Sequence, residues 1–106
     1  MSITDDRLKA FEAKYANDKA VAFKITARRN KKLGLWAAAI LEKEDVDAYV
    51  HEVIAADFIE AGDEDIISKV EDDLKAAAKA QMPEMVRHKL AEFEIEAKAE
   101  IAQELS

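Results

Sequence analysis

The chain has 106 residues, a formal net charge of −7 and no cysteine. A chain of this length forms one domain with a single core, and the lack of cysteine excludes disulfides, a thiol nucleophile and a thiolate metal site. The acidic balance argues against general nucleic-acid binding, which depends on lysines and arginines that neutralise phosphates. Because no apolar run approaches the roughly 18 residues of a membrane span and the N-terminus shows no signal-peptide pattern, we expect a cytoplasmic protein without a membrane span.

Helical patterns fill the sequence, which has only two glycines and one proline. The first helix is expected to begin at Thr4 or Asp5, which are good capping residues. Its apolar side chains form one narrow stripe: Leu8, Phe11 and Tyr15. The second helix is expected to follow a break or cap at Asn17 and Asp18 and to end near Leu41.

Three further helices are expected after a turn at residues 42–44, over residues 46–61, 64–81 and 83–105. Asp45 fits the N-cap of the first of these helices, and Gly62 fits the position after its end. Pro83 fits the first position of the last helix. No strand pattern competes, so the expected fold class is all-α: a four-helix bundle over residues 18–106 with a mobile N-terminal helical arm over residues 1–17.

Two charged residues interrupt the apolar stripes. Arg29 lies on the apolar face of the second helix, and Asp57 lies on that of the third. If these helices are antiparallel around the turn near residue 43, positions 29 and 57 have nearly the same height, and we predict a partly buried Arg29–Asp57 salt bridge. Alternatively, Arg29 extends to water and Asp57 faces solvent at the edge of its stripe.

Residues 23–36 are the most basic part of the chain, with five cations, no acid and the only tryptophan. Lys24, Arg28 and Lys31, here called the basic face, recur at helical spacing and can bind a phosphate or an acidic protein surface. Two simpler explanations stay open. The face is an ordinary solvated one, or it neutralises residues 42–73, which carry thirteen acids against two lysines.

Motifs for catalysis or metal binding are incomplete. The stretch from His51 to Ala55 begins like the zinc helix of metalloproteases, but Ala55 stands where the second histidine must be. The acidic runs lack the spacing and central glycine of a calcium loop, and the sequence has no glycine-rich phosphate loop. We expect neither a metal site nor enzymatic activity.

Three segments resemble one protein family. Residues 5–18 read D-D-R-x-x-A-F-E-x-K-Y-A-x-D, residues 23–38 read F-K-x-x-A-R-R-N-K-x-L-G-L-W-A-A, and residues 56–65 read A-D-F-x-E-A-G-x-E-D. In this order and spacing they are similar to the zeta subunit family of alphaproteobacteria, whose members inhibit the F-type ATP synthase. The chain departs from the family pattern at three positions where members often have histidine, an acid and glycine: Asn17, Ala39 and Glu42.

The resemblance implies a regulatory protein made of a helical bundle and a mobile arm. It implies that the arm enters a catalytic interface of the ATPase head, formed by alpha, beta and gamma subunits, and blocks ATP hydrolysis on the cytoplasmic side of the bacterial membrane. The resemblance implies no required cofactor, but it does imply weak binding of ADP or ATP to the bundle. We expect the chain to be a monomer. The candidate partner-binding residues of the arm are Asp5, Asp6, Arg7, Leu8, Phe11, Glu12, Lys14 and Tyr15.

The chemistry of the arm is compatible with this mechanism. Its apolar stripe suits binding in a groove, and an isolated helix of this length is marginal in water, so we expect it to order on binding. The alternative is that Phe11 and Tyr15 pack on the bundle, and the two states can alternate. Two other functions stay open: an adenine-nucleotide-binding module that uses the basic face without inhibitory activity, and an interaction protein that binds another partner near Trp36.

Overall fold

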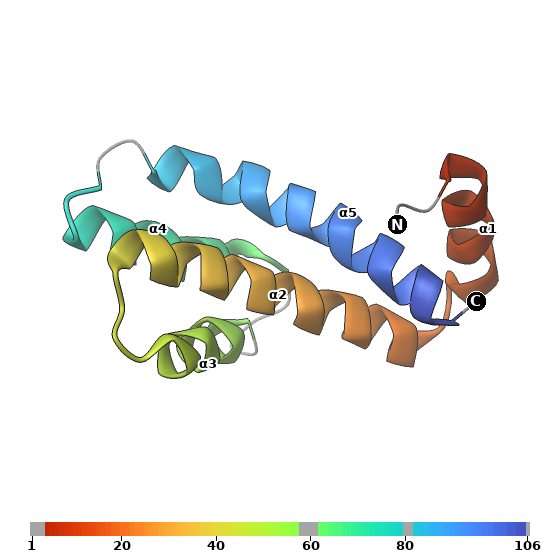
Figure 1. Ribbon diagram of the computed structural model, residues 1–106, viewed down its shortest axis with the longest axis horizontal. Helices are drawn as coiled ribbons and strands as arrows, with labels where there is room; N and C mark the ends of the chain where they lie inside the picture. Colours follow the sequence, from red (N-terminus) through yellow and green to blue (C-terminus); the bar gives the residue numbers. More distant parts are fainter. Residues whose placement is uncertain (1–3, 58–61, 80–81, 106) are drawn as a thin grey trace.

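The computed structural model describes residues 4–57, 62–79 and 82–105. Within these ranges the chain is helical without strands, which confirms the all-α class. The elements are α1 (Asp5–Tyr15), α2 (Lys19–Leu41), α3 (Val46–Ala56), α4 (Glu64–Ala76), the short 3-10 helix η1 (Pro83–Met85) and α5 (Val86–Leu105). They form a helical bundle with α1 across one end (Figure 1). Among the described residues, no helix is both long enough and apolar enough to cross a membrane.

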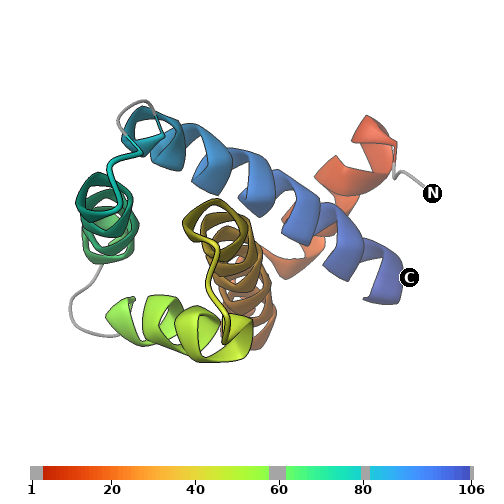
Figure 2. The ribbon, with the colours of Figure 1, turned by 60° about the vertical axis from the view of Figure 1, so that its left-hand side comes forward.

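The central helix of the bundle is α2, because α3, α4 and α5 all pack against it. The chain reverses direction between α2 and α3, because Val50 lies against Gly34 and Asp57 against Asn30, as the antiparallel arrangement predicts. Figures 1 and 2 show that α3 is inclined to α2 and does not lie along it. At Gly34 of α2, a Cβ atom would lie 3.2 Å from the Cα atom of Val50 on α3. The absence of a side chain at Gly34 therefore lets the two backbones approach closely.

The main core lies between α2, α3, α4 and α5. Tyr49 is buried in this core, and its hydroxyl donates a hydrogen bond to Asp73 Oδ2 at 2.8 Å. Burial is the main cause that raises the pKa of Tyr49 above its usual range. Six large side chains of this core have 0 % exposure: Leu33, Val53, Ile66, Val70, Leu74 and Val86. The bundle is thus closed around aliphatic side chains from all four helices.

Both ends of α2 are fixed by local hydrogen bonds. At its start, the carboxylate of Asp18 accepts two backbone N–H groups of the first turn. At its end, Glu42 has a left-handed conformation with φ of 55°. The N–H groups of Glu42 and Lys43 donate to the carbonyl groups of Ala39 and Ala38, at 3.3 and 3.0 Å. This is the C-terminal motif in which glycine is favoured at the left-handed position, and here it holds a glutamate.

The third helix is shorter than predicted. It ends at Ala56, and Asp57 follows in a turn whose N–H donates to the carbonyl of Ile54 at 3.2 Å. The remainder of the predicted helix, residues 58–61, lies outside the described residues. Gly62 has a left-handed φ of 97°, but it precedes α4 and does not close α3.

The fourth helix also ends early, at Ala76 rather than near residue 81. Ala78 takes a left-handed φ of 60°, which lets the N–H of Lys79 donate to the carbonyl of Leu74 at 3.0 Å. The alanines at 76–78 are exposed. Their helix propensity therefore has no buried face to support it, and propensity alone rarely sustains a helix.

Candidate functional site

The arm helix α1 lies at the end of the bundle where α5 finishes and α2 begins (Figure 1). Thr4 caps it, because its Oγ1 accepts the N–H of Arg7 at 3.3 Å. Asp5 and Asp6 occupy the first turn, where the helix dipole favours acids. These groups stabilise the N-terminus of α1. The helix ends at Tyr15, a short turn before α2.

The apolar stripe of α1 faces the bundle. Phe11 is 8 % exposed, and Leu8 and Tyr15 are half-buried. These three side chains pack in a second hydrophobic cluster, the arm cluster, with four residues of α2 and α5: Val21, Ile25, Ile101 and Ala102. The apolar residues that were predicted to bind a partner are thus covered by the chain's own bundle.

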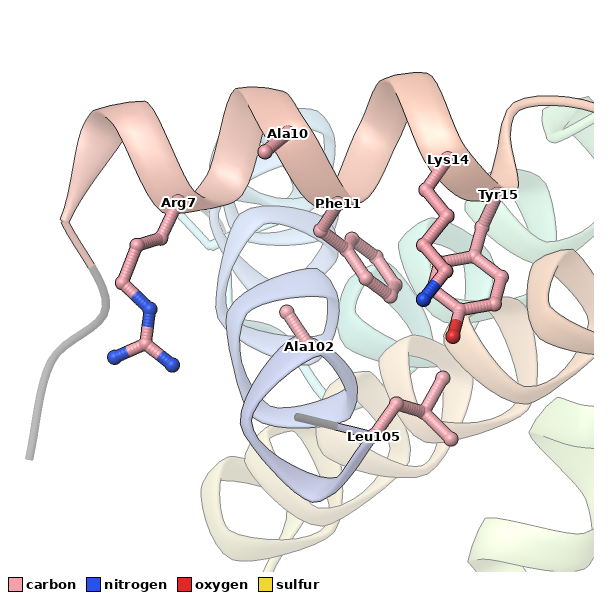
Figure 3. A pocket seen from close by; sticks show the side chains of 7 residues that line it. All are labelled: Arg7, Ala10, Phe11, Lys14, Tyr15, Ala102 and Leu105. Atoms are coloured by element: carbon pink, nitrogen blue, oxygen red, sulfur yellow. The ribbon is translucent and has the colours of Figure 1, made fainter.

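Packing under α1 is incomplete. A hollow of about 180 Å³ lies between α1 and the end of α5. Figure 3 shows Phe11 and Tyr15 reaching toward it from α1, with Ala102 and Leu105 on the α5 side. Atoms that line an unfilled space lose their dispersion contacts, so this cluster holds α1 less firmly than the main core holds the other helices.

The charged residues of the arm are exposed and weakly tied to the bundle. Lys98 Nζ of α5 lies 3.4 Å from Glu12 Oε1, and exposed pairs of this kind contribute little to stability. Arg7 and Lys14 border the hollow under α1 (Figure 3). Lys14 Nζ lies 5.4 Å from the centre of the Tyr15 ring, and neither cation forms an ion pair within the described ranges.

The basic face of α2 lines a single hollow of about 530 Å³, but its three cations differ. Arg28 Nη1 lies 3.3 Å from Glu100 Oε1, and its Nη2 donates to Glu104 Oε1 at 3.0 Å. The hydrogen bond with Glu104 raises the pKa of Arg28 and lowers the pKa of Glu104. Lys24 and Lys31 form no ion pair with a described residue. One of the three predicted anion-binding residues is therefore already neutralised.

Acids of α5 neutralise other cations of α2. Lys32 Nζ lies 2.8 Å from Glu100 Oε2 and 3.3 Å from Glu96 Oε1. Glu96, Glu100 and Glu104 recur every fourth residue, which places them in a row facing α2. Acids of α5, and not those of residues 42–73, thus pair with Arg28 and Lys32, whereas Arg29 of the same helix does pair with Asp57 and Asp63 of that acidic stretch.

Arg29 is 3 % exposed, and it connects α2 to three other parts of the chain. Its Nη2 lies 3.9 Å from Asp57 Oδ2 and 3.1 Å from Asp63 Oδ1, and its Nη1 donates to Glu94 Oε1 at 3.1 Å. Asn30 Oδ1 accepts from Arg29 Nε, and Asn30 Nδ2 donates to Asp57 Oδ2, both at 2.9 Å. The structure therefore brings Arg29 and Asp57 together, chiefly through Asn30, and Arg29 does not extend to water.

Sequence reasoning missed three members of this network: Asp63, Asn30 and Glu94. Asn30 is 2 % exposed, and its signal was available, since asparagine is disfavoured inside a helix unless its side chain has a specific partner. Glu94 offered no such signal. Its side chain is 47 % exposed, and in the sequence it looks like any other glutamate on α5.

Glu52, the acid of the stretch that resembles part of a zinc site, has another role. Glu52 Oε1 lies 3.2 Å from Lys69 Nζ, which joins α3 to α4. Throughout the described part of the chain, no group of three or more histidine and acidic side chains is placed to hold a metal ion.

A family model described as ATPase inhibitor subunit zeta matches residues 1–100. The chain belongs to this family. The zeta match spans α1 and the helices that carry the main core, so arm and bundle are parts of one family unit. The family's name describes an inhibitor subunit of an ATPase, which supports an inhibitory role and an association with ATP synthase. No curated protein sequence matches the chain.

Proposed function

We propose that this zeta-family chain is a non-catalytic regulator that blocks ATP hydrolysis by inserting its arm into a catalytic interface of the ATP synthase head. The alpha, beta and gamma subunits would form that interface, on the cytoplasmic side of the bacterial membrane. The observation that carries the proposal is the docking of α1. Its apolar stripe suits a partner's groove, and a small, incompletely packed cluster covers it.

The arm helix can exchange one apolar surface for another. A helix of 11 residues is marginal when isolated, so its stripe must be covered for the helix to persist. In the free chain the arm cluster covers it, and in the complex a groove of the head would cover the same three side chains: Leu8, Phe11 and Tyr15. Because apolar burial lost at the bundle is regained at the head, the exchange costs little net free energy.

The junction between arm and bundle supports a division into residues 1–17 and 18–106. The main core contains no residue of α1. Asp18 caps α2 with its own side chain and uses no group of α1 to do so. Release of α1 would therefore leave α2 capped and the main core closed.

The test is ATP hydrolysis by the cognate ATP synthase head, titrated with the full chain and with a chain that lacks residues 1–17. Inhibition by the full chain alone is expected. The variant Phe11→Ser with Tyr15→Ser should lose inhibition, whereas Leu35→Ser, which changes an exposed apolar residue of α2, should keep it. Inhibition that survives removal of residues 1–17 would contradict the proposal.

A second candidate function is adenine-nucleotide binding without inhibition. It is favoured by the hollow that gathers the basic face beside the exposed ring of Phe23, since cations can hold phosphates and an aromatic ring can stack on a base. Titration of the full chain with ADP, followed by NMR, tests it. Saturable shifts on α2, together with failure to inhibit the head, would favour this candidate over the first.

A further inference from the structure

The bundle carries a second surface of the kind that binds a protein helix. We propose that a trough along the first half of α2 docks an acidic amphipathic helix of the ATPase head. This inference rests on the proposed function, because it assigns a second contact to the same complex. It differs from that function in needing no movement of the arm.

The trough consists of two adjoining hollows. One has a volume of about 370 Å³ and the other about 530 Å³, and both are lined by Phe23, Ala27 and Ile54. The hollows lie on the two sides of the line that Phe23 and Ala27 form along α2. Lys19 borders the first hollow, and Lys24 and Lys31 border the second. In an α-helix, residues 19–31 cover roughly 18 Å, which matches about three turns of a partner helix.

Apolar side chains in the trough are exposed. Phe23 is 61 % exposed and Leu105 is 40 % exposed. In Figure 1, α3 lies beside the second half of α2, and no helix lies beside the first half on that side. Exposed apolar surface gathered in one concave place marks interaction sites in soluble proteins, and a helix laid into it would bury both side chains.

The charges of the trough select an acidic partner. Lys19, Lys24 and Lys31 form no ion pair within the described residues, in a chain whose net charge is −7. The acids that reach the trough are already engaged. Glu104 pairs with Arg28, and Asp57 accepts from the amide of Asn30. A second copy of this chain would meet its own negative charge, whereas an acidic helix would meet three lysines that form no ion pair within the described residues.

A nucleotide fits the trough less well than a helix does. The guanidinium of Arg28 would be the best phosphate ligand of the basic face, but Glu100 and Glu104 occupy it. A nucleotide would also leave the hollow beside Lys19 empty, because its phosphates would lie near Lys24 and Lys31 in the other one. An amphipathic helix that packs over Phe23 and Ala27 would place side chains in the hollows on both sides of them.

The trough adjoins the place where the arm is docked. Leu105 lines the hollow under α1 and also lines the trough. A partner helix in the trough would therefore lie next to the arm, and one partner can engage both surfaces. Two linked contacts raise the affinity well above that of either contact alone.

Photo-crosslinking from position 23 identifies the occupant. Phe23 of the full chain is replaced by p-benzoylphenylalanine, which keeps an aromatic ring at an exposed position, and the chain is irradiated with the cognate head. A crosslink to an acidic helical segment of the head is expected. A crosslink to a second copy, or no crosslink with a head that the chain inhibits, would each overturn the inference.

A charge-reversal pair measures what the trough contributes. Lys24→Glu with Lys31→Glu should raise the half-inhibitory concentration of the full chain about tenfold or more. Lys75→Glu with Lys79→Glu, an equal charge change at the end of α4, should change it less than about twofold. Circular dichroism verifies that both variants fold. If the unaltered chain inhibits and the two double variants have the same half-inhibitory concentration, the trough is not a docking site, but the proposed function stands. If the unaltered chain does not inhibit, the proposed function itself fails.

Discussion

The main core and the arm cluster use the same kinds of side chain but differ in closure. In the main core, six large side chains from four helices have 0 % exposure. In the arm cluster, the most buried residues are Phe11 at 8 %, Val21 at 7 %, and Ile101 and Ala102 at 4 %, and a hollow of about 180 Å³ lies beside them. The first region is a closed interior, whereas the second is a surface contact between one short helix and the end of the bundle.

The free energy of unfolding the bundle therefore differs from the free energy of releasing α1. Unfolding of the bundle requires the main core to open, whereas release of α1 requires only the arm cluster to open. Local openings of this kind have free energies well below that of global unfolding. Stability and inhibition should therefore respond to different residues.

The largest effect should come from truncation in the main core. Leu74→Ala is expected to lower the free energy of unfolding by about 2–5 kcal/mol, because it leaves a cavity in a closed interior. Phe11→Ala should lower it by about 1 kcal/mol or less, since α1 can undock without opening that core. Urea denaturation followed by circular dichroism measures both. Equal losses would show that the arm is an integral part of the bundle.

The Arg29 network should also act on stability and not on inhibition. Arg29→Ala removes a buried cation from three acids and is expected to cost about 3 kcal/mol. Asp57→Asn should cost about 1 kcal/mol, because Asp63 and Glu94 still pair with Arg29. Thermal melting compares the two variants. An unchanged melting temperature for Asp57→Asn would mean that this carboxylate does not matter to the network.

Glycine at the end of α2 should stabilise the bundle. Glu42 holds a left-handed conformation that costs an ordinary residue roughly 1 kcal/mol, so Glu42→Gly is expected to gain about 0.5–1 kcal/mol. Ala39→Gly, less than one turn earlier in the helix, should lose about 1 kcal/mol. A gain for both variants, or for neither, would contradict the assignment of residue 42 as the left-handed position.

Lys98→Glu should strengthen inhibition slightly. It removes the exposed pair with Glu12 without changing the arm, and such pairs contribute about 0.2–1 kcal/mol. The arm should then be released more easily, and the half-inhibitory concentration should fall about 1.5- to 5-fold. Weaker inhibition by this variant would mean that docking on α5 prepares the arm for binding rather than withholding it.

The smallest effect should be the pH dependence of the contact between α2 and α5. The hydrogen bond from Arg28 lowers the pKa of Glu104 below its ordinary value of 4.5. Glu104 therefore adds stability at pH values above 4.5, and that stability is lost as the pH falls below 4.5 through the lowered pKa. Melting curves in acid should show this loss, and Glu104→Gln should reduce its steepness. An unchanged slope would exclude the pair as its source.

The sequence predicted where the helices begin better than it predicted which helices and side chains pack against each other. Periodic apolar residues and caps such as Asp18 and Asp45 identified where helices begin, because these signals are local. The early end of α4 was not predictable, since alanine rarely takes the left-handed conformation that Ala78 adopts. The partners of Arg28 were also out of reach, because the facing row of glutamates depends on how α5 packs against α2.

For the candidate site, too, the sequence did not reveal which elements pack together. The apolar stripe of α1 was visible as a stripe, but its docking on Ile101 and Ala102 depends on where α5 ends in space. The trough beside Phe23 has no sequence signal of its own. Three helices form it, and a lone phenylalanine on a basic helix does not reveal that α3 leaves that face uncovered.

A reversible tether between arm and bundle tests directly whether α1 must leave the bundle for the chain to inhibit. The chain has no cysteine, so Glu12→Cys with Lys98→Cys provides the two thiols for a short, reducible bis-thiosulfonate linker. The tethered chain should fail to inhibit ATP hydrolysis by the cognate head, and reduction should restore inhibition to the level of the same variant blocked with a monofunctional reagent. Full inhibition by the tethered chain would show that the arm need not leave the bundle, and would contradict the insertion of the arm into the head.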